Sequence, residues 1–296
     1  MDKHSAHVQA KALELLRQFA ELKAVGLAGS QASGDADEYS DLDLQAFTAG
    51  GHPDPQRRKG VYESMQGMEV GPLNHCVSAV FELPPLSNLF AVDWLRIDGM
   101  RRDVLWISQE GMDRAFSAIR EQLDYPEAAA GLASSVQSVS DPEGFLKALV
   151  SRYPEYTEQR ARRKAGSAFG YSHFFICTRG VLAKAARRND VAGYNEAEAH
   201  MVATLIHALC AVNRSWQRYP RRLRYYAKGF EVIPANFADR LESLLMRRGA
   251  ARDLEGASRE LRSLFQDLAR AAMERYPDWK LPLDWPQWSP SQQRWY

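Results

Sequence analysis

The pattern of hydrophobic and polar residues divides the chain into a first part with strand signals and a second part with helical ones. Residues 6–22 place their apolar side chains mostly on one helical face. Residues 24–30 form a short apolar run that ends at Gly29-Ser30. Residues 41–47, DLDLQAF, alternate polar and apolar side chains, which is typical of a strand with one exposed face. The pattern predicts a helix and then two strands joined by a polar loop.

A hairpin is the clearest element of the first part. Asp98-Gly99 separates two runs rich in apolar, β-branched and aromatic residues, and Asp-Gly is a favoured two-residue hairpin turn. Residues 75–83 predict a further strand, and residues 50–58 are rich in Gly and Pro, as loops are. We therefore expect an α+β domain, a mixed sheet with flanking helices, over residues 1–112.

The rest of the chain has helical periodicity and few strand signals. It predicts a helical-bundle domain over residues 113–275, with a linker near residues 138–144. Residues 276–296 are rich in Trp and Pro and cannot form a regular helix. We expect this tail to be extended and to pack its indoles on the helices; the alternative is that it binds a partner or lines the substrate site.

Composition and charge narrow the classes of function. The 296 residues carry a formal net charge of +1, so no global field would hold an extended nucleic acid. No apolar run is long enough to span a bilayer. The polar N-terminus lacks the apolar core of a signal peptide, so a cytoplasmic location is expected. The three cysteines lack metal-ligand spacing. Nothing in the sequence fixes the oligomeric state.

Candidate chemistry is concentrated in paired aspartates. Asp41 and Asp43 are two residues apart on a predicted strand, so their carboxylates share a face and repel each other. A divalent cation such as Mg²⁺ removes that repulsion, and the nearby Gly29-Ser30 turn offers backbone amides to a phosphate. A third acid, Asp103, lies in an apolar strand, where a carboxylate is costly unless it faces a cleft or a cation. Asp93, on the first hairpin strand, is the competing choice.

Residues 26–44 and 97–108 carry a resemblance to a known family. A Gly-Ser turn, a loop, an Asp-x-Asp strand and a later Asp together resemble the DNA polymerase β nucleotidyltransferase superfamily, in particular its aminoglycoside and lincosamide branch. The resemblance implies that Asp41 and Asp43 bind two Mg²⁺ ions, or Mn²⁺, and that Asp103 binds the catalytic one. It also implies that Gly29 and Ser30, with Ser40 beside them, hold the nucleotide.

The implied reaction moves a nucleoside monophosphate, with ATP the expected donor among the triphosphates, onto an acceptor hydroxyl and releases pyrophosphate. Residues 208–230 resemble a segment in helical domains of the same branch. That resemblance makes Arg221, Arg222 and Lys228 candidate triphosphate contacts; the alternative is a solvated helix face. Nothing selects a general base among the candidates Glu82, Glu196, Glu198 and His75.

The acceptor is expected to be a small hydroxylated molecule, and antibiotic modification is the family's best-known activity. Acidic residues of the loop, Asp35, Asp37 and Glu38, would suit a cationic acceptor, whereas the basic run at residues 214–228 argues against one. The alternatives are a protein or tRNA acceptor, as in toxin–antitoxin nucleotidyltransferases, and a non-catalytic nucleotide-binding module.

Overall fold

In the computed structural model, the described residues are 3–34, 36, 40–73, 90–121, 136–173, 175, 180–216, 223–246, 253–281, 288–289 and 294–295. The contacts divide the chain into two compact units, Met1–Glu155 and Tyr156–Tyr296. The expected boundary at residue 112 therefore lies inside unit 1, because a further strand and two helices belong to that unit. Each unit is described by itself.

Unit 1 is built around a mixed sheet. Its elements are α1 (Lys3–Leu16), β1 (Leu22–Leu27), α2 (Gly29–Ser33), β2 (Leu42–Thr48), α3 (Pro55–Glu63), β3 (Met68–Val70), β4 (Phe90–Ile97), β5 (Met100–Ser108), α5 (Gln109–Glu121), β6 (Gln137–Ser140) and α7 (Phe145–Ser151). Within the described ranges the sheet has six strands in the order β3-β4-β5-β2-β1-β6. Only the β2–β5 pair among them is parallel.

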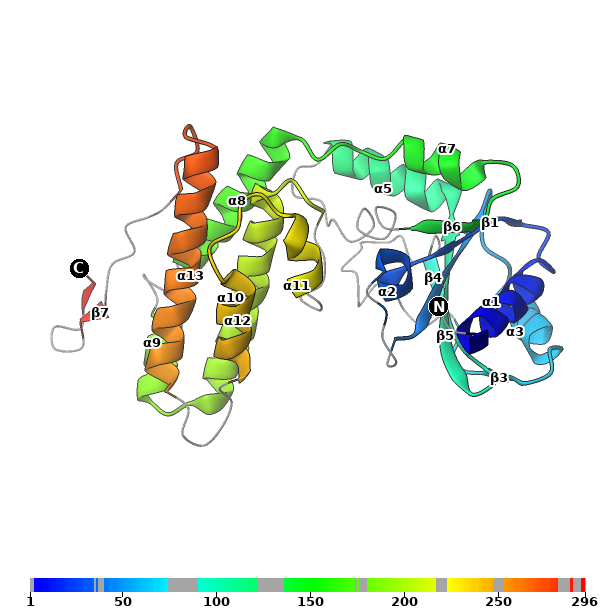
Figure 1. The fold of residues 1–296 in the computed structure, drawn as a ribbon, viewed down its shortest axis with the longest axis horizontal. Coiled ribbons are helices and arrows are strands. Elements are labelled where there is room, and N and C mark those ends of the chain that lie inside the picture. The colour runs from blue at the N-terminus through cyan, green and yellow to red at the C-terminus, as the bar shows by residue number, and fades with distance from the viewer. Residues whose placement is uncertain are drawn as a thin grey trace. The chain divides into compact units, whose positions relative to one another are not determined.

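The predicted hairpin is β4 and β5, joined by Asp98-Gly99 (Figure 1). Asp98 has φ 50° and Gly99 has φ 79°, so both central residues adopt the left-handed conformation that a tight hairpin turn of this kind requires. Lys11 of α1 donates to both carboxylate oxygens of Asp98, at 2.9 and 2.8 Å. The turn is therefore fixed both by its backbone and by the N-terminal helix.

One face of the sheet carries a core cluster that packs against α1 and α3, while side chains of the opposite face such as Phe47 and Ile107 are also buried. Successive strand residues point to opposite faces, and the core cluster takes Leu44 and Ala46 from β2 and Val104 and Trp106 from β5. These side chains pack against residues of α1 and α3, and Phe19 meets Trp106 edge to face at 5.1 Å. The alternate residues of the same strands, among them Asp43 and Asp103, belong to the opposite face.

Residues 137–144 differ from the expected linker. Gln137–Ser140 form strand β6, which pairs with β1, and the Asp141 carboxylate accepts hydrogen bonds from the backbone amides of Leu146 and Lys147, both at 3.0 Å. The polar, Pro-containing composition of this segment did not predict the short edge strand or the start of α7, because neither needs a long apolar run.

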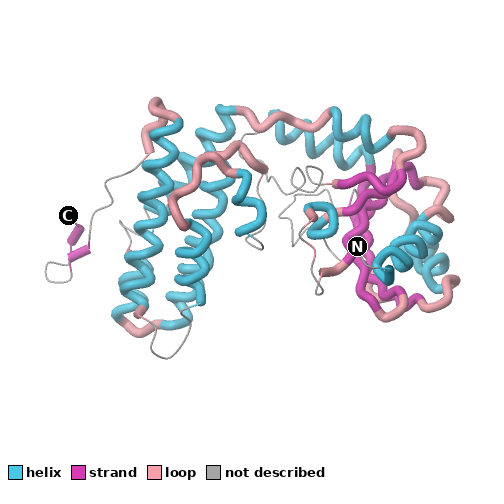
Figure 2. Tube along the Cα trace, viewed as in Figure 1, coloured by secondary structure: helices cyan, strands magenta, loops and turns pink. Residues whose placement is uncertain are grey.

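Over its described residues, unit 2 is helical apart from one short strand pair (Figure 2). Its described elements are α8 (Glu158–His173), α9 (Val181–Arg187), α10 (Val191–Val212), α11 (Leu223–Tyr226), the 3₁₀ helix η2 (Ala227–Gly229), α12 (Phe237–Met246), α13 (Leu254–Arg275), β7 (Trp288–Ser289) and β8 (Arg294–Trp295). Arg240 joins α12 to α13 through Glu260 at 2.7 Å and Asp267 at 2.8 Å. In the tail, Trp279 is buried and stacks on Tyr276.

The predicted α+β class, with an N-terminal mixed sheet flanked by helices and a C-terminal helical region, is confirmed. The strand predicted at residues 75–83 lies outside the described residues. Among the helices that the structure describes, none combines the length and the apolar character needed to cross a bilayer.

Candidate functional site

Asp43 and Asp103 are brought side by side by the parallel pairing of β2 and β5. The register pairs Asp43 directly with Asp103, although the two residues are far apart in the sequence. Asp41 immediately precedes β2 and is exposed, and both paired aspartates are partly exposed. Because residues i and i+2 of an extended chain point the same way, the acidic groups gather near the start of these two strands, on the face opposite the core cluster of α1 and α3.

The Gly-Ser turn lies directly against this acidic group. Gly29 begins α2 with φ 61°, and a Cβ at this position would lie 2.3 Å from Oδ2 of Asp43. The backbone amide of Ala28 donates to the carbonyl oxygen of Asp43 at 2.9 Å, which ties the end of β1 to β2. Glycine is required here for its left-handed backbone and for the close approach of the carboxylate. Ser30 follows in α2, and the half-buried Ser40 precedes Asp41.

Arg101 is a residue of this site that the sequence analysis missed. Its Nε lies 3.2 Å from Oδ1 of Asp103 and its Nη2 lies 3.3 Å from Oδ2, so it donates to both carboxylate oxygens. Its guanidinium also lies 5.0 Å from the ring centroid of Trp94. The signal was present in the sequence, because Arg101 and Asp103 alternate on one strand and therefore share a face.

The charges of all three predicted aspartates reach Arg101. The pKa of Arg101 is raised, first by the hydrogen bond to Asp103 and then by the charge of that residue, while burial acts in the opposite direction. Asp41 and Asp43 raise the pKa of Arg101 further through their charges. The three carboxylates predicted from the sequence therefore all favour the charged form of the Arg101 guanidinium.

The donor chemistry of these residues suits a hard divalent cation, because carboxylate oxygens are the ligands that Mg²⁺ prefers. Across the part of the chain that the structure describes, however, no three His, Cys, Asp or Glu side chains are grouped closely enough to hold a metal ion as they stand. In the arrangement seen here, both oxygens of Asp103 interact with Arg101. Carboxylates are suitable ligands for the ion, and Arg101 would compete with it for the carboxylate of Asp103.

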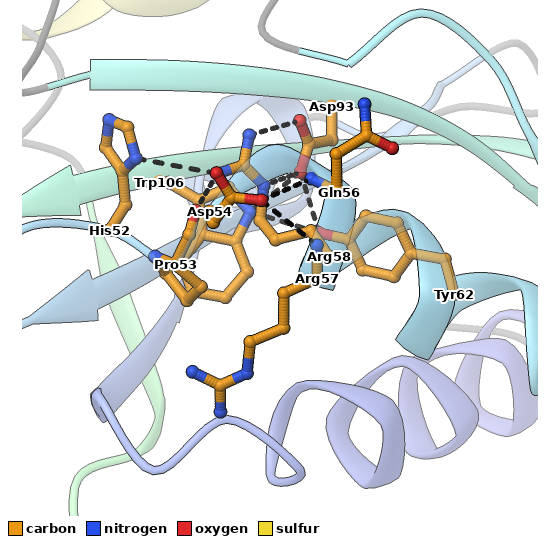
Figure 3. A network of polar contacts seen from close by, with 9 residues as sticks. All are labelled: His52, Pro53, Asp54, Gln56, Arg57, Arg58, Tyr62, Asp93 and Trp106. Carbon is orange, nitrogen blue, oxygen red and sulfur yellow. Dashed lines mark hydrogen bonds and ion pairs between the residues drawn. The ribbon is translucent and has the colours of Figure 1, made fainter.

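Asp93, the competing choice for the third acid, lies in the core. Its side chain is fully buried, and Arg58 donates to both of its oxygens, from Nε at 2.7 Å and from Nη2 at 3.1 Å (Figure 3). The Tyr62 hydroxyl donates to Oδ2 at 2.8 Å, and Trp106 Nε1 lies 2.9 Å from the same oxygen. This environment favours Asp103 over Asp93 as the third acid of the site.

The network around Asp93 also reaches the segment before α3. Arg58 donates to the carbonyl oxygen of Pro53, and its Nη1 lies 3.5 Å from Nδ1 of His52. Burial and then the charge of Arg58 lower the pKa of His52. Burial, followed by the charge of Asp93, raises the pKa of Tyr62 well above its ordinary value. The groups form a paired, desolvated cluster that joins α3 to β4 and β5.

The candidate residues beyond the acidic face are distributed differently. Glu198 is buried in α10, whereas Glu196 is exposed on the same helix, and His75 and Glu82 lie outside the described residues. Lys228 is exposed in η2 of unit 2, while Arg221 and Arg222 lie outside the described residues. The loop acids at positions 35, 37 and 38 also lie outside them. Their predicted roles stay predictions.

Part of the basic run at residues 214–228 is paired with carboxylates. Arg214 contacts Glu158 of α8 at 2.6 Å, and Arg224 contacts Glu242 of α12 at 2.6 Å. Arg224 also pairs with Asp239. These two arginines thus join elements within unit 2, a role that the sequence did not reveal because their partners are distant along the chain.

Comparison with solved structures finds several similar chains. The chain is similar to the crystal structure of a nucleotidyltransferase-like protein from Exiguobacterium sibiricum 255-15, with a TM-score of 0.38 and 10% sequence identity, over 91% of this chain and 77% of that one. No protein-family model matches the sequence, and no similar curated protein was found. The functional argument therefore rests on the residues of the acidic face.

Proposed function

We propose that the acidic face of unit 1 is the active site of a metal-dependent nucleotidyltransferase. The enzyme would transfer a nucleoside monophosphate, with AMP expected, from a nucleoside triphosphate to a hydroxyl of a small acceptor molecule and would release pyrophosphate. The observation that carries the proposal is the direct pairing of Asp43 with Asp103, with Gly29 packed against the Asp43 carboxylate.

The residues have separate roles in this proposal. Asp41 and Asp43 would hold two Mg²⁺ ions, and Asp103 would hold the one nearer the acceptor. Bound divalent cations in such a site activate the attacking hydroxyl and neutralise the charge of the leaving pyrophosphate. Gly29 leaves room for a phosphate near the carboxylates, and Ser30 and Ser40 offer hydroxyl donors beside them. The protein's own contribution is to hold these groups in a fixed geometry.

The test compares thermal stabilisation by ATP, CTP, GTP and UTP, with and without Mg²⁺, in the wild type and in Asp41→Asn/Asp43→Asn. A ligand that binds only the folded protein stabilises it by about 2.7 kcal/mol at one hundred times its dissociation constant. We expect one triphosphate to raise the melting temperature only with Mg²⁺, and the double variant to lose that effect. Pyrophosphate release in an acceptor screen with that donor then tests turnover.

A matched control is Glu63→Gln/Asp113→Asn, which also removes two solvent-accessible negative charges but from α3 and α5. It should keep the stabilisation by the triphosphate. The proposal fails if no triphosphate stabilises the wild type, or if the aspartate variant and the control respond alike.

A further inference from the structure

Arg101 occupies an unusual position for a cation in a proposed metal site. Its side chain is 49% exposed and that of Asp103 is 27% exposed, so the guanidinium is accessible to solvent. Its guanidinium contacts the Asp103 carboxylate and the face of Trp94, both within the β4–β5 hairpin. An arginine held in this way can leave one carboxylate without disturbing the core, because its other contact is a ring face on the protein surface.

The guanidinium of Arg101 and a bound cation compete for Asp103. Arg101 donates to both oxygens of that carboxylate, and although the carboxylate has further lone pairs, two positive groups beside one carboxylate repel each other. Three carboxylates without a cation would repel one another, and a single guanidinium relieves that repulsion. Arg101 is therefore suited to neutralise the aspartates when no metal is bound.

A second arginine lies beside Arg101 and bears on which partner its guanidinium can take besides Asp103. Arg96 lies directly opposite Arg101 in the antiparallel β4–β5 register, and Arg96 is exposed. Like charges directly opposite on a sheet are destabilising. Glu69 of β3 lies opposite Arg96 on its other side, so the repulsion falls mainly on Arg101 once a cation takes Asp103. A triphosphate bound at the neighbouring aspartates would supply a new anionic partner, because guanidinium groups bind phosphate oxygens through two hydrogen bonds.

We propose that Arg101 is a switch between the two states of the site: it pairs with Asp103 in the metal-free protein and turns to the triphosphate when a divalent cation takes that carboxylate. This inference rests on the proposed function and adds a residue to it. Arg101 opposes the binding of a cation alone and supports the binding of a cation together with a triphosphate. The two ligands are therefore coupled through one side chain.

The experiment measures two affinities of Arg101→Gln. One is the affinity for Mn²⁺ alone, from the paramagnetic resonance signal of the free ion, and the other is the affinity for inorganic tripolyphosphate at saturating Mn²⁺, by calorimetry. Since an exposed ion pair contributes little, we expect Mn²⁺ alone to bind about 3- to 5-fold more tightly. We expect tripolyphosphate to bind about tenfold more weakly, because a charge-assisted contact is lost. Arg101→Lys should lie between the wild type and Arg101→Gln in both affinities.

Arg57→Gln is a matched control. Arg57 pairs with Glu21 and lies over the ring of Phe19, as Arg101 pairs with Asp103 and lies over Trp94. Arg57→Gln should leave the affinities for Mn²⁺ and for tripolyphosphate unchanged.

Opposite changes in the two affinities of Arg101→Gln support the switch; no change, or changes in the same direction, overturns it. These outcomes differ from a failure of the proposed function, in which Asp41→Asn/Asp43→Asn binds Mn²⁺ as well as the wild type does.

Discussion

Gly29 is the residue whose replacement tests the geometry of the acidic face most directly. Gly29→Ala forces a side chain into a left-handed backbone and places a Cβ 2.3 Å from Oδ2 of Asp43. We expect a loss of more than about 1–2 kcal/mol of unfolding free energy, the cost of the backbone conformation alone. We also expect weaker Mn²⁺ binding, because the Asp43 carboxylate must move. Chemical denaturation and Mn²⁺ titration measure the two effects.

Gly99→Ala provides the comparison for that variant. Gly99 also has a positive φ, but no atom lies within 4 Å of its would-be Cβ. This variant should show the backbone cost and normal Mn²⁺ binding. Equal Mn²⁺ affinities in both variants would contradict the close approach of Gly29 to Asp43.

Asp93 and Asp103 should differ sharply when each is replaced by asparagine. Asp93→Asn leaves the buried Arg58 without its charged partner, so we expect a loss of about 3–5 kcal/mol in the free energy of unfolding. Asp103→Asn breaks a partly exposed pair and should change stability by about 1 kcal/mol or less. Urea denaturation of both variants measures this difference, and similar losses would show that the two carboxylates do not have the environments described.

The sequence could not separate these two aspartates by pattern alone, since each lies in an apolar strand. The distinction comes from partners that are distant in the sequence: Arg58 and Tyr62 of α3 for Asp93, and Asp43 of β2 for Asp103. The preference for Asp103 came from the family resemblance. The contact of Arg101 with Asp103 lies within one strand, where the two residues share a face.

At the scale of elements, Asp141 determines how α7 begins. Its carboxylate accepts from the amides of Leu146 and Lys147, which have no earlier helical partners. Asp141→Ala should lower the free energy of unfolding by about 1 kcal/mol and speed hydrogen exchange in α7.

Glu143→Ala serves as the control for Asp141, because Glu143 is an exposed acid of the same segment that pairs only with Lys23 among the contacts described. Its replacement should leave hydrogen exchange in α7 unchanged. Equal exchange in the two variants would mean that the carboxylate of Asp141 is not what stabilises the start of the helix.

Elements with strong local signals were predicted well, and those that depend on distant pairing were not. The Asp-Gly turn was predicted because its backbone requirement is local. The edge strand β6 was not, since a segment of three polar residues and one valine becomes a strand only when β1 offers its hydrogen bonds. The order of strands and the parallel β2–β5 register also depend on contacts that no local pattern encodes.

For the whole molecule, the two units should unfold as separate cooperative bodies. Arg240→Met removes contacts to Glu260, Ser263 and Asp267 that join α12 to α13 within unit 2. We expect two calorimetric transitions in the wild type. In this variant only one of them should shift to lower temperature, with a loss of about 2 kcal/mol or more in the free energy of unfolding of unit 2. The same transition should not respond to Asp93→Asn. A single transition that moves in both variants would contradict independent units.

The parallel pairing of β2 with β5 has a consequence for the order of folding. The β4–β5 hairpin closes over two residues and can form within microseconds, as hairpins do. The neighbouring β2 strand is separated from it by a long stretch of chain, so Asp43 meets Asp103 only after a slow, non-local docking step. The acidic face is then among the last features to appear during refolding. If the proposed site binds Mn²⁺, uptake of the ion during refolding would then follow the completion of the sheet.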